Sequence, residues 1–363
     1  MLESQKIKII TIEKDMASVM AQNSKENISA ILKRLNVFVD DSWDKDVLSL
    51  ILRDTILENP EYVLYIHGKE ILTFVIRLWE SEELDLSPAD WALLGQLRLL
   101  GFIEYSNEQI NSDKENCIKV VKEAKEHLYF YLKSKTSRHL MNKLENWESV
   151  IRGMLTYYGI ISFNRLYIYF CKCSNEPVDD DLLHLFLSVR INLLSFGSFV
   201  LETQSSTEYY QNYEASHPEQ IIECCMNDKS LEYCLPKYET LLFLGNNNGL
   251  GDWEGMSEIA AILMDDFEVE YYRTIVIIKS IVLMIQNGES FDEITKQLFI
   301  LSPQLREKEK DIRAHLIKLY ESVPVYNLKG WTRQEVRKVH SPSPVFTVIK
   351  GGKKRKIISR NPE

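Results

Sequence analysis

Glycine and proline are scarce in this chain, with 14 glycines and 10 prolines among 363 residues. This scarcity excludes collagen-like and low-complexity sequences. It leaves long stretches rich in Leu, Ile, Glu and Lys, which favour helix over strand by intrinsic propensity. We therefore predict a mainly α fold, and the length is a soft prior for two or three domains.

The chain also lacks a long apolar run. Its most apolar segment, Thr274 to Ile285, contains Lys279 and is much shorter than the roughly 20 residues that span a bilayer. The first residues do not show the basic-then-apolar layout of a signal peptide. We therefore expect a cytoplasmic protein that makes no membrane contact.

Metal-ligand spacings are missing as well. Cys171 and Cys173 are two residues apart on a predicted helix, so their side chains point about 200° apart. Structural zinc sites instead use a Cys-x2-Cys knuckle or two ligands on one face of a helix. The six cysteines fit reduced thiols better than a disulfide scaffold. The seven histidines are scattered without a ligand spacing, so we expect no metal site and no cofactor.

Catalytic motifs are absent from the sequence. The glycines of Gly245 to Gly251 lack the strand and the Gly-Lys-Ser/Thr that a phosphate-binding loop needs, so a turn between helices is the better interpretation. No nucleophile elbow, kinase motif set or carboxylate pair occurs. We therefore predict that the chain is not an enzyme, with an enzyme of unrecognised type as a minor alternative.

What the chain does have is an uneven charge. The formal net charge is −10, yet residues 326–363 hold ten Lys plus Arg against two Glu, so the first 325 residues carry −18. Because phosphate affinity needs clustered cations, a nucleic acid or an acidic protein would contact the tail if it contacts the chain at all. The candidate contact residues are Lys350, Lys353, Lys354, Arg355, Lys356 and Arg360.

The central stretch, Trp147 to Glu202, has the pattern of three short helices followed by a β-wing. Gly159 ends the first helix, Ser162 can cap the second, and Pro177 separates the second from the third. Residues 195–202 are aromatic and β-branched around a glycine, which suits a short strand. This order predicts a winged-helix-like domain.

The third helix of that domain offers few basic side chains. It opens with three aspartates, and residues 146–205 hold four Lys plus Arg against six Asp plus Glu. This is a poor phosphate surface, so a protein contact or a structural role is favoured over DNA reading. The possible partner contacts are His184, Ser188, Arg190 and Asn192.

Helix and turn signals divide the rest of the chain. A hairpin over Phe102 to Val121 follows a series of helices, so the N-terminal part is expected to be a second winged-helix-like unit. The predicted regions are an N-terminal helical domain (1–121), one connector helix (122–145), the winged-helix-like domain (146–205), a helical bundle (206–323) and a basic, mobile tail (324–363).

Short phrases of the sequence resemble a known group of proteins. Leu328-Lys329-Gly330-Trp331-Thr332 and the closing Lys356-Ile357-Ile358-Ser359-Arg360-Asn361-Pro362-Glu363 are similar to the lead-in of the SEC-C motif. That motif is the small zinc-binding tail of the SecA ATPase and of many uncharacterised helical bacterial proteins. The central phrase Tyr157-Tyr158-Gly159-Ile160-Ile161-Ser162 also resembles the middle of those bacterial proteins. The zinc ligands of the motif are absent here, so the resemblance implies no metal site on these residues. If the natural chain continued into paired cysteines, the tail would be their tether.

Together these features predict a non-enzymatic cytoplasmic adaptor or regulator of a bacterium or its mobile elements. It would bind a protein partner through helical and winged-helix-like surfaces. The alternative is a nucleic-acid-associated regulator that uses the basic tail.

Overall fold

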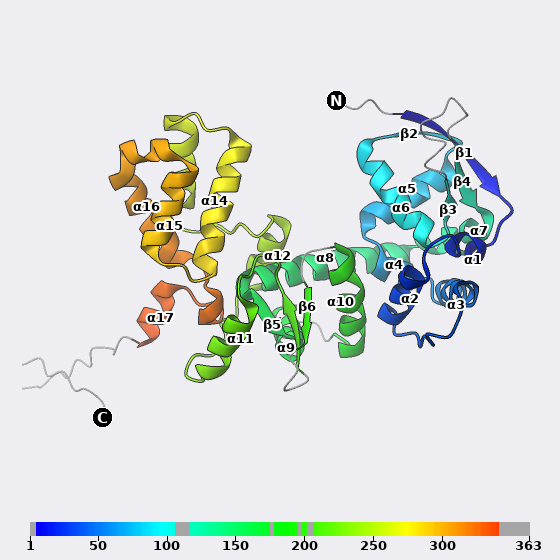
Figure 1. The fold of residues 1–363 in the computed structure, drawn as a ribbon, viewed down its shortest axis with the longest axis horizontal. Helices are drawn as coiled ribbons and strands as arrows, with labels where there is room; N and C mark the ends of the chain where they lie inside the picture. Colours follow the sequence, from blue (N-terminus) through cyan, green and yellow to red (C-terminus); the bar gives the residue numbers. More distant parts are fainter. Residues whose placement is uncertain (1–4, 106–116, 175–177, 195–197, 202–206, 341–363) are drawn as a thin grey trace, which may run out of the picture. The chain divides into compact units, whose positions relative to one another are not determined.

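The computed structural model describes residues 5–105, 117–174, 178–194, 198–201 and 207–340. The chain folds into two compact units (Figure 1). The first comprises Met1–Thr156, Ile161–Tyr213 and Pro236–Gly249, and the second Tyr157–Ile160, Glu214–Leu235 and Leu250–Glu363. This division differs from the five consecutive regions expected from the sequence, because each unit collects segments that are far apart in the chain.

The first unit confirms the mainly α class. Its helices are α1 (Met16–Met20), α2 (Lys25–Arg34), α3 (Lys45–Glu58), α4 (Tyr62–Ile66), α5 (Lys69–Glu80), α6 (Pro88–Leu99), α7 (Lys122–Lys133), α8 (Lys135–Tyr158, of which the last two residues belong to the second unit), α9 (Phe163–Ser174), α10 (Asp180–Leu194) and α12 (Tyr238–Asn246). Its strands are β1 (Gln5–Ile12), β2 (Glu83–Leu86), β3 (Ile103–Glu104), β4 (Cys117–Val121), β5 (Ile160–Ser162, which begins in the second unit), β6 (Ser198–Leu201) and β7 (Glu208–Gln211).

Four strands near the N-terminus form a sheet in the order β2-β1-β4-β3. The predicted hairpin is confirmed, because β3 pairs antiparallel with β4, and the predicted strand at 6–12 is β1. The parallel pairing of β1 with β4 was not predicted. More than a hundred residues separate these strands, so no local signal reports their pairing. Helix α6 begins with the predicted cap, in which Ser87 and Asp90 exchange hydrogen bonds.

The central part has the predicted order of elements. Helix α8 is followed by β5, α9, α10, β6 and β7, and the three strands form a sheet in the order β5-β7-β6. The winged-helix assignment stays a prediction. The prediction of a single connector helix is wrong, because two helices meet at Ser134. The extended backbone of Ser134 ends α7, and its hydroxyl accepts a hydrogen bond from the Ser137 amide of α8.

Two glycines allow α8 and α12 to touch along their backbones. A Cβ atom on Gly153 of α8 would lie 1.9 Å from the Leu241 carbonyl oxygen, and one on Gly245 of α12 would lie 1.8 Å from the Ser149 carbonyl oxygen. The contact is reciprocal, so both positions require the absence of a side chain. Gly245 is therefore a packing residue within a helix.

The second unit is a helical bundle. Its elements are α11 (Pro218–Asn227), α13 (Met256–Ala261), the π-helix η1 (Ile262–Asp266), α14 (Tyr271–Gln286), α15 (Phe291–Leu301), the 3₁₀ helices η2 (Pro303–Lys308) and η3 (Tyr326–Leu328), α16 (Glu309–Ser322) and α17 (Arg333–His340). Helices α14, α15 and α16 pack side by side (Figure 1). The apolar residues of α14 from Ile277 to Ile285 lie in the core, whereas Tyr271 and Tyr272 are exposed. Within the described ranges, no helix combines the length and the apolarity needed to cross a bilayer.

Residues after Pro324 belong to the folded second unit. Val325 and Tyr326 are buried, and the Tyr326 hydroxyl donates a hydrogen bond to the Gln286 side chain. The Lys329 amino group is buried as well and donates to the carbonyl oxygens of Asp228 and Leu231. A mobile tail therefore does not begin at Pro324, as the sequence predicted, because this segment completes the core of the unit. The six basic residues predicted as nucleic-acid contacts, Lys350, Lys353, Lys354, Arg355, Lys356 and Arg360, lie outside the described residues.

Candidate functional site

Arg190, predicted as an exposed partner contact on the third helix, is buried. Its side chain is 2% exposed, and one terminal nitrogen donates hydrogen bonds to the carbonyl oxygens of Leu64 (3.0 Å) and His67 (2.9 Å) at the end of α4. The other terminal nitrogen lies 3.6 Å from a carboxylate oxygen of Glu148. Arg190 thus caps the carbonyl end of a helix of its own unit, and the prediction of a surface role is wrong for it.

The other predicted contacts on α10 are also engaged within the chain. The Ser188 hydroxyl donates to the carbonyl oxygen of Arg34 in α2 (3.2 Å). His184 lies 3.0 Å from a carboxylate oxygen of Glu208 in β7 and packs edge-on against Phe163. The side chain of Asn192 lies outside the described residues. Because α10 packs against α2 and α4, the structure does not bring these residues together as a free surface.

His67 lies beside Arg190 in the interior. Its ring is 3% exposed, and neither nitrogen makes a hydrogen bond of normal geometry. Burial, followed by the charge of Arg190, lowers the pKa of His67 to about 3, although Gln96 acts in the opposite direction. The imidazole is therefore neutral at physiological pH. This cluster lies in the interior, and its polar groups bind within the first unit.

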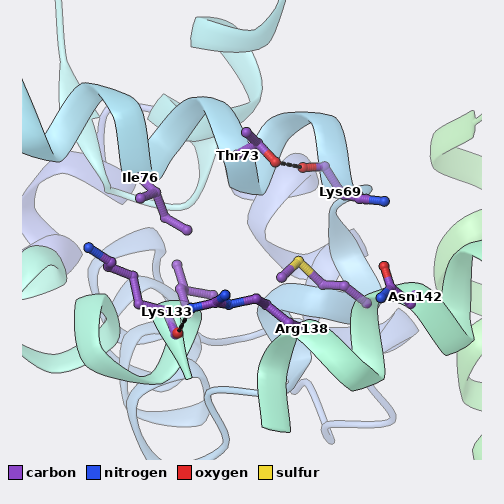
Figure 2. Close-up of a pocket in the computed structure, with 8 residues that line it drawn as sticks. Lys69, Thr73, Ile76, Lys133, Arg138 and Asn142 are labelled. Atoms are coloured by element: carbon purple, nitrogen blue, oxygen red, sulfur yellow. Dashed lines mark hydrogen bonds between the residues drawn. The ribbon is translucent and has the colours of Figure 1, made fainter. Parts of the chain in front are cut away.

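A surface pocket of about 470 Å³ lies between α5 and the junction of α7 and α8. Figure 2 shows Ile76 of α5 pointing into this space opposite Arg138 of α8. The lining residues are Lys69, Thr73, Ile76, Leu132, Lys133, Arg138, Met141 and Asn142. Three of them are cationic, three are aliphatic or thioether side chains, and none is acidic or aromatic. The volume is in the range of small-ligand and side-chain pockets.

The three cations of the pocket differ in their partners. Lys69 lies 3.0 Å from a Glu145 carboxylate oxygen, and Lys133 lies 2.6 Å from one of Glu80. The hydrogen bond from Lys133 keeps the pKa of Glu80 below its ordinary value. All four side chains of these pairs are solvent-exposed, so each pair contributes little to stability and can exchange partners. The Arg138 guanidinium donates to the Lys133 carbonyl oxygen (2.9 Å).

The chain around the pocket is locally basic. Lys133 to Lys143 includes four Lys plus Arg and no Asp or Glu, within a protein whose net charge is −10. Arg138 also stands at the beginning of the 24-residue helix α8, which has no acidic residue in its first turn. A cation there opposes the helix macrodipole. Arg138 is therefore in an electrostatically unfavourable position at the pocket.

An aromatic pair lies on α7, the helix that supplies Leu132 and Lys133 to the pocket. Phe130 is 79% exposed, and its ring lies 5.5 Å from that of Tyr129, whose hydroxyl donates to Glu80. Phe130 and Lys133 are three residues apart and share one face of the helix. A large exposed aromatic side chain beside a pocket is the type of residue that anchors protein interfaces.

No metal centre stands out in the part of the chain that the structure describes. All six cysteines are free thiols. The one group with ligand-like proximity there is Asp179, Asp180 and Asp181, which are exposed at the start of α10 and complement its dipole.

Sequence reasoning missed the pocket. Residues 122–145 read as one amphipathic connector, since Ser134 is neither glycine nor proline. The signal that was present is the acid-free basic run from Lys133 to Lys143. The lining residues of α5 precede those of α7 and α8 by more than fifty residues, so only the tertiary structure shows that Ile76 and Lys69 close the pocket.

No protein-family model, no curated protein and no solved structure matches this chain.

Proposed function

We propose that this chain is a non-enzymatic adaptor or regulator that binds a protein partner through the surface around α7 and the start of α8. The observation that carries the proposal is the open pocket of about 470 Å³, lined by cationic and aliphatic side chains. Phe130, 79% exposed, lies on the adjacent helix face. Aromatic side chains, Met and Arg are enriched in protein interfaces.

The predicted partner contacts on α10 do not support this function, because Arg190 and Ser188 are bound to the chain's own α4 and α2. The surface at α7 and α8 replaces them. It combines a local positive charge, which steers an oppositely charged partner, with apolar area that contributes affinity when water is excluded.

Photocrosslinking in the cells that express the chain tests the proposal. A benzoylphenylalanine at position 130 is expected to give one or a few discrete protein adducts, identified by mass spectrometry. The matched control carries the same residue in place of Tyr272, which is 74% exposed and lies in the second unit.

Adducts at position 130 that are missing at position 272 support a partner that docks on the first unit. An absence of protein adducts at position 130, or the same abundant proteins at both positions, would remove the proposed function.

A further inference from the structure

We propose that the pocket between α5, α7 and α8 binds an acidic segment of the partner, with a carboxylate on Arg138 and a neighbouring aliphatic side chain against Ile76. This inference rests on the proposed function and specifies the chemistry of the partner. It commits to a peptide segment that combines Asp or Glu with Leu, Ile, Val or Met.

The guanidinium of Arg138 has capacity for a ligand. It carries five N–H donors in a planar fork, and its hydrogen bond to the Lys133 carbonyl oxygen uses one nitrogen. Among the residues that the structure describes, no Asp or Glu forms an ion pair with Arg138. A carboxylate can bind the remaining donors in a bidentate arrangement. Its charge-assisted hydrogen bonds are shorter and stronger than hydrogen bonds between neutral groups.

The charges around Arg138 also call for an anion. Lys69 and Lys133 line the same pocket, and none of the residues that line it is acidic. The cationic side chain at the start of α8 carries an electrostatic cost in the free chain. A bound carboxylate relieves that cost, because it pairs with Arg138 and complements the helix end.

The uncharged lining distinguishes a peptide from a nucleic acid. Ile76 and Met141 present aliphatic and thioether surface, whereas Leu132, which also lines the pocket, is buried; no lining residue is aromatic. Single-stranded nucleic acids are bound by stacking on aromatic rings, which this pocket does not supply. Aliphatic side chains fit such a surface, and methionine adapts its shape to them. The pocket therefore matches an anion that carries an aliphatic group.

Selection of a random twelve-residue peptide library displayed on phage tests the proposal on the full chain. Three immobilised proteins are compared: the native chain, Arg138→Gln and Lys135→Gln. The control substitution removes the same charge three residues earlier on α8, at an exposed lysine that does not line the pocket. Both substituted side chains are exposed, so folding is expected to be unchanged, which circular dichroism verifies.

Peptides that pair Asp or Glu with aliphatic residues are expected to be enriched on the native chain and on Lys135→Gln. The Kd of the most enriched peptide, synthesised and measured by fluorescence anisotropy, is expected to rise about tenfold or more with Arg138→Gln, which corresponds to the loss of one charge-assisted bidentate contact. Replacing its acidic residues by Asn and Gln is expected to weaken binding similarly.

Two results would overturn this inference and leave the proposed function standing. One is enrichment of neutral or basic peptides, and the other is equal binding of acidic peptides to Arg138→Gln and to the native chain. Binding of a labelled 20-nucleotide oligothymidine that Arg138→Gln abolishes, without any enriched peptide, would assign the pocket to nucleic acid instead. The crosslinking at position 130 reports separately on whether a protein partner exists.

Discussion

Arg190 shows how much a single side chain contributes to the first unit. From α10 it donates hydrogen bonds to the carbonyl oxygens of Leu64 and His67 at the end of α4, and it forms an ion pair with Glu148 of α8. One buried guanidinium therefore connects three helices. Glu148 also binds Arg152 at 2.7 Å, so it keeps a partner if Arg190 is removed. The carbonyl oxygens of α4 do not have this alternative.

Arg190→Met is therefore expected to lower the free energy of unfolding by about 2–4 kcal/mol, because buried carbonyl oxygens lose their donors. Urea unfolding followed by tryptophan fluorescence measures this, since Trp147 packs edge-on against Phe186, over which the guanidinium of Arg190 lies. The control is Arg273→Met on the exposed start of α14. An equal midpoint for Arg190→Met and the native chain would contradict the capping role.

The neutral His67 makes stability depend on pH. Its pKa is about 3 in the folded chain because of burial, whereas an unfolded histidine titrates near 6.5. Between these values the unfolded state binds a proton that the folded state does not, so stability is complete above about pH 6.5 and falls as the pH decreases. From pH 7.5 to pH 5 the loss amounts to about 2 kcal/mol.

Replacing His67 with Leu is expected to remove that part of the pH dependence. Unfolding measured at pH 7.5 and pH 5 should show a smaller difference for His67→Leu than for the native chain, while other titrating groups contribute equally to both. A difference of the same size in the two proteins would show that His67 is protonated or exposed at pH 5.

At the scale of elements, the crossing of α8 with α12 is set by two glycines. Gly153→Ala is expected to destabilise the first unit by about 3 kcal/mol, because its Cβ would overlap the Leu241 carbonyl oxygen and the helices would have to separate. Thermal unfolding measures the effect.

Gly95→Ala on α6 is the matched control. Beyond its chain neighbours and the backbone of its own helix, no described atom lies within 4 Å of a Cβ at Gly95, so alanine should raise stability by up to about 1 kcal/mol through its helix propensity. If both alanines behaved alike, the close approach of α8 and α12 would be wrong.

The break between α7 and α8 is the element on which the pocket depends. Ser134 has extended backbone angles (φ −65°, ψ 158°) and caps α8 with its hydroxyl. The residue three positions later is Ser137 and not Glu or Gln, so the chain shows no reciprocal capping box at this point. The periodicity of 122–145 therefore predicted one long helix, and the break between α7 and α8 that forms the pocket was missed.

At the scale of the whole molecule, each unit is completed by segments from distant parts of the chain. In the second unit, Gly330 packs against the rings of Tyr157 and Tyr158, and Gly159 packs against Tyr326. The Tyr158 hydroxyl donates to the Cys234 carbonyl oxygen at 2.6 Å. The segments around Tyr157–Gly159 and Gly330 thus lie in contact here, and their glycines and rings are explained by packing.

A chain that ends at Val323 is expected to lose the cooperative unfolding of the second unit, whereas a chain that ends at His340 keeps it. The shorter chain lacks buried Val325, Tyr326 and Lys329, and therefore leaves the Gln286 side chain and the 228–234 loop without these partners. Hydrogen exchange of the α14 amides from Ile277 to Ile285 measures the effect. Equal protection in the two chains would show that residues 324–340 do not belong to this core.

The local interactions of this protein could be predicted from its amino-acid sequence. The capping pairs Ser87–Asp90 and Thr332–Glu335, the helix end at Gly159 and the hairpin strands around 102–121 each depend on residues that are close in the chain, so their patterns predict them. The mainly α class follows from the same local preferences.

Which helix faces are exposed depends on contacts between distant parts of the chain. The face of α10 that carries Arg190 reads as a polar surface, but it is buried because α2 and α4, more than 120 residues earlier, pack on it. The pocket at α7 and α8 exists because α5 supplies its other side. Both outcomes depend on contacts between residues distant in sequence, whose energies no local pattern contains.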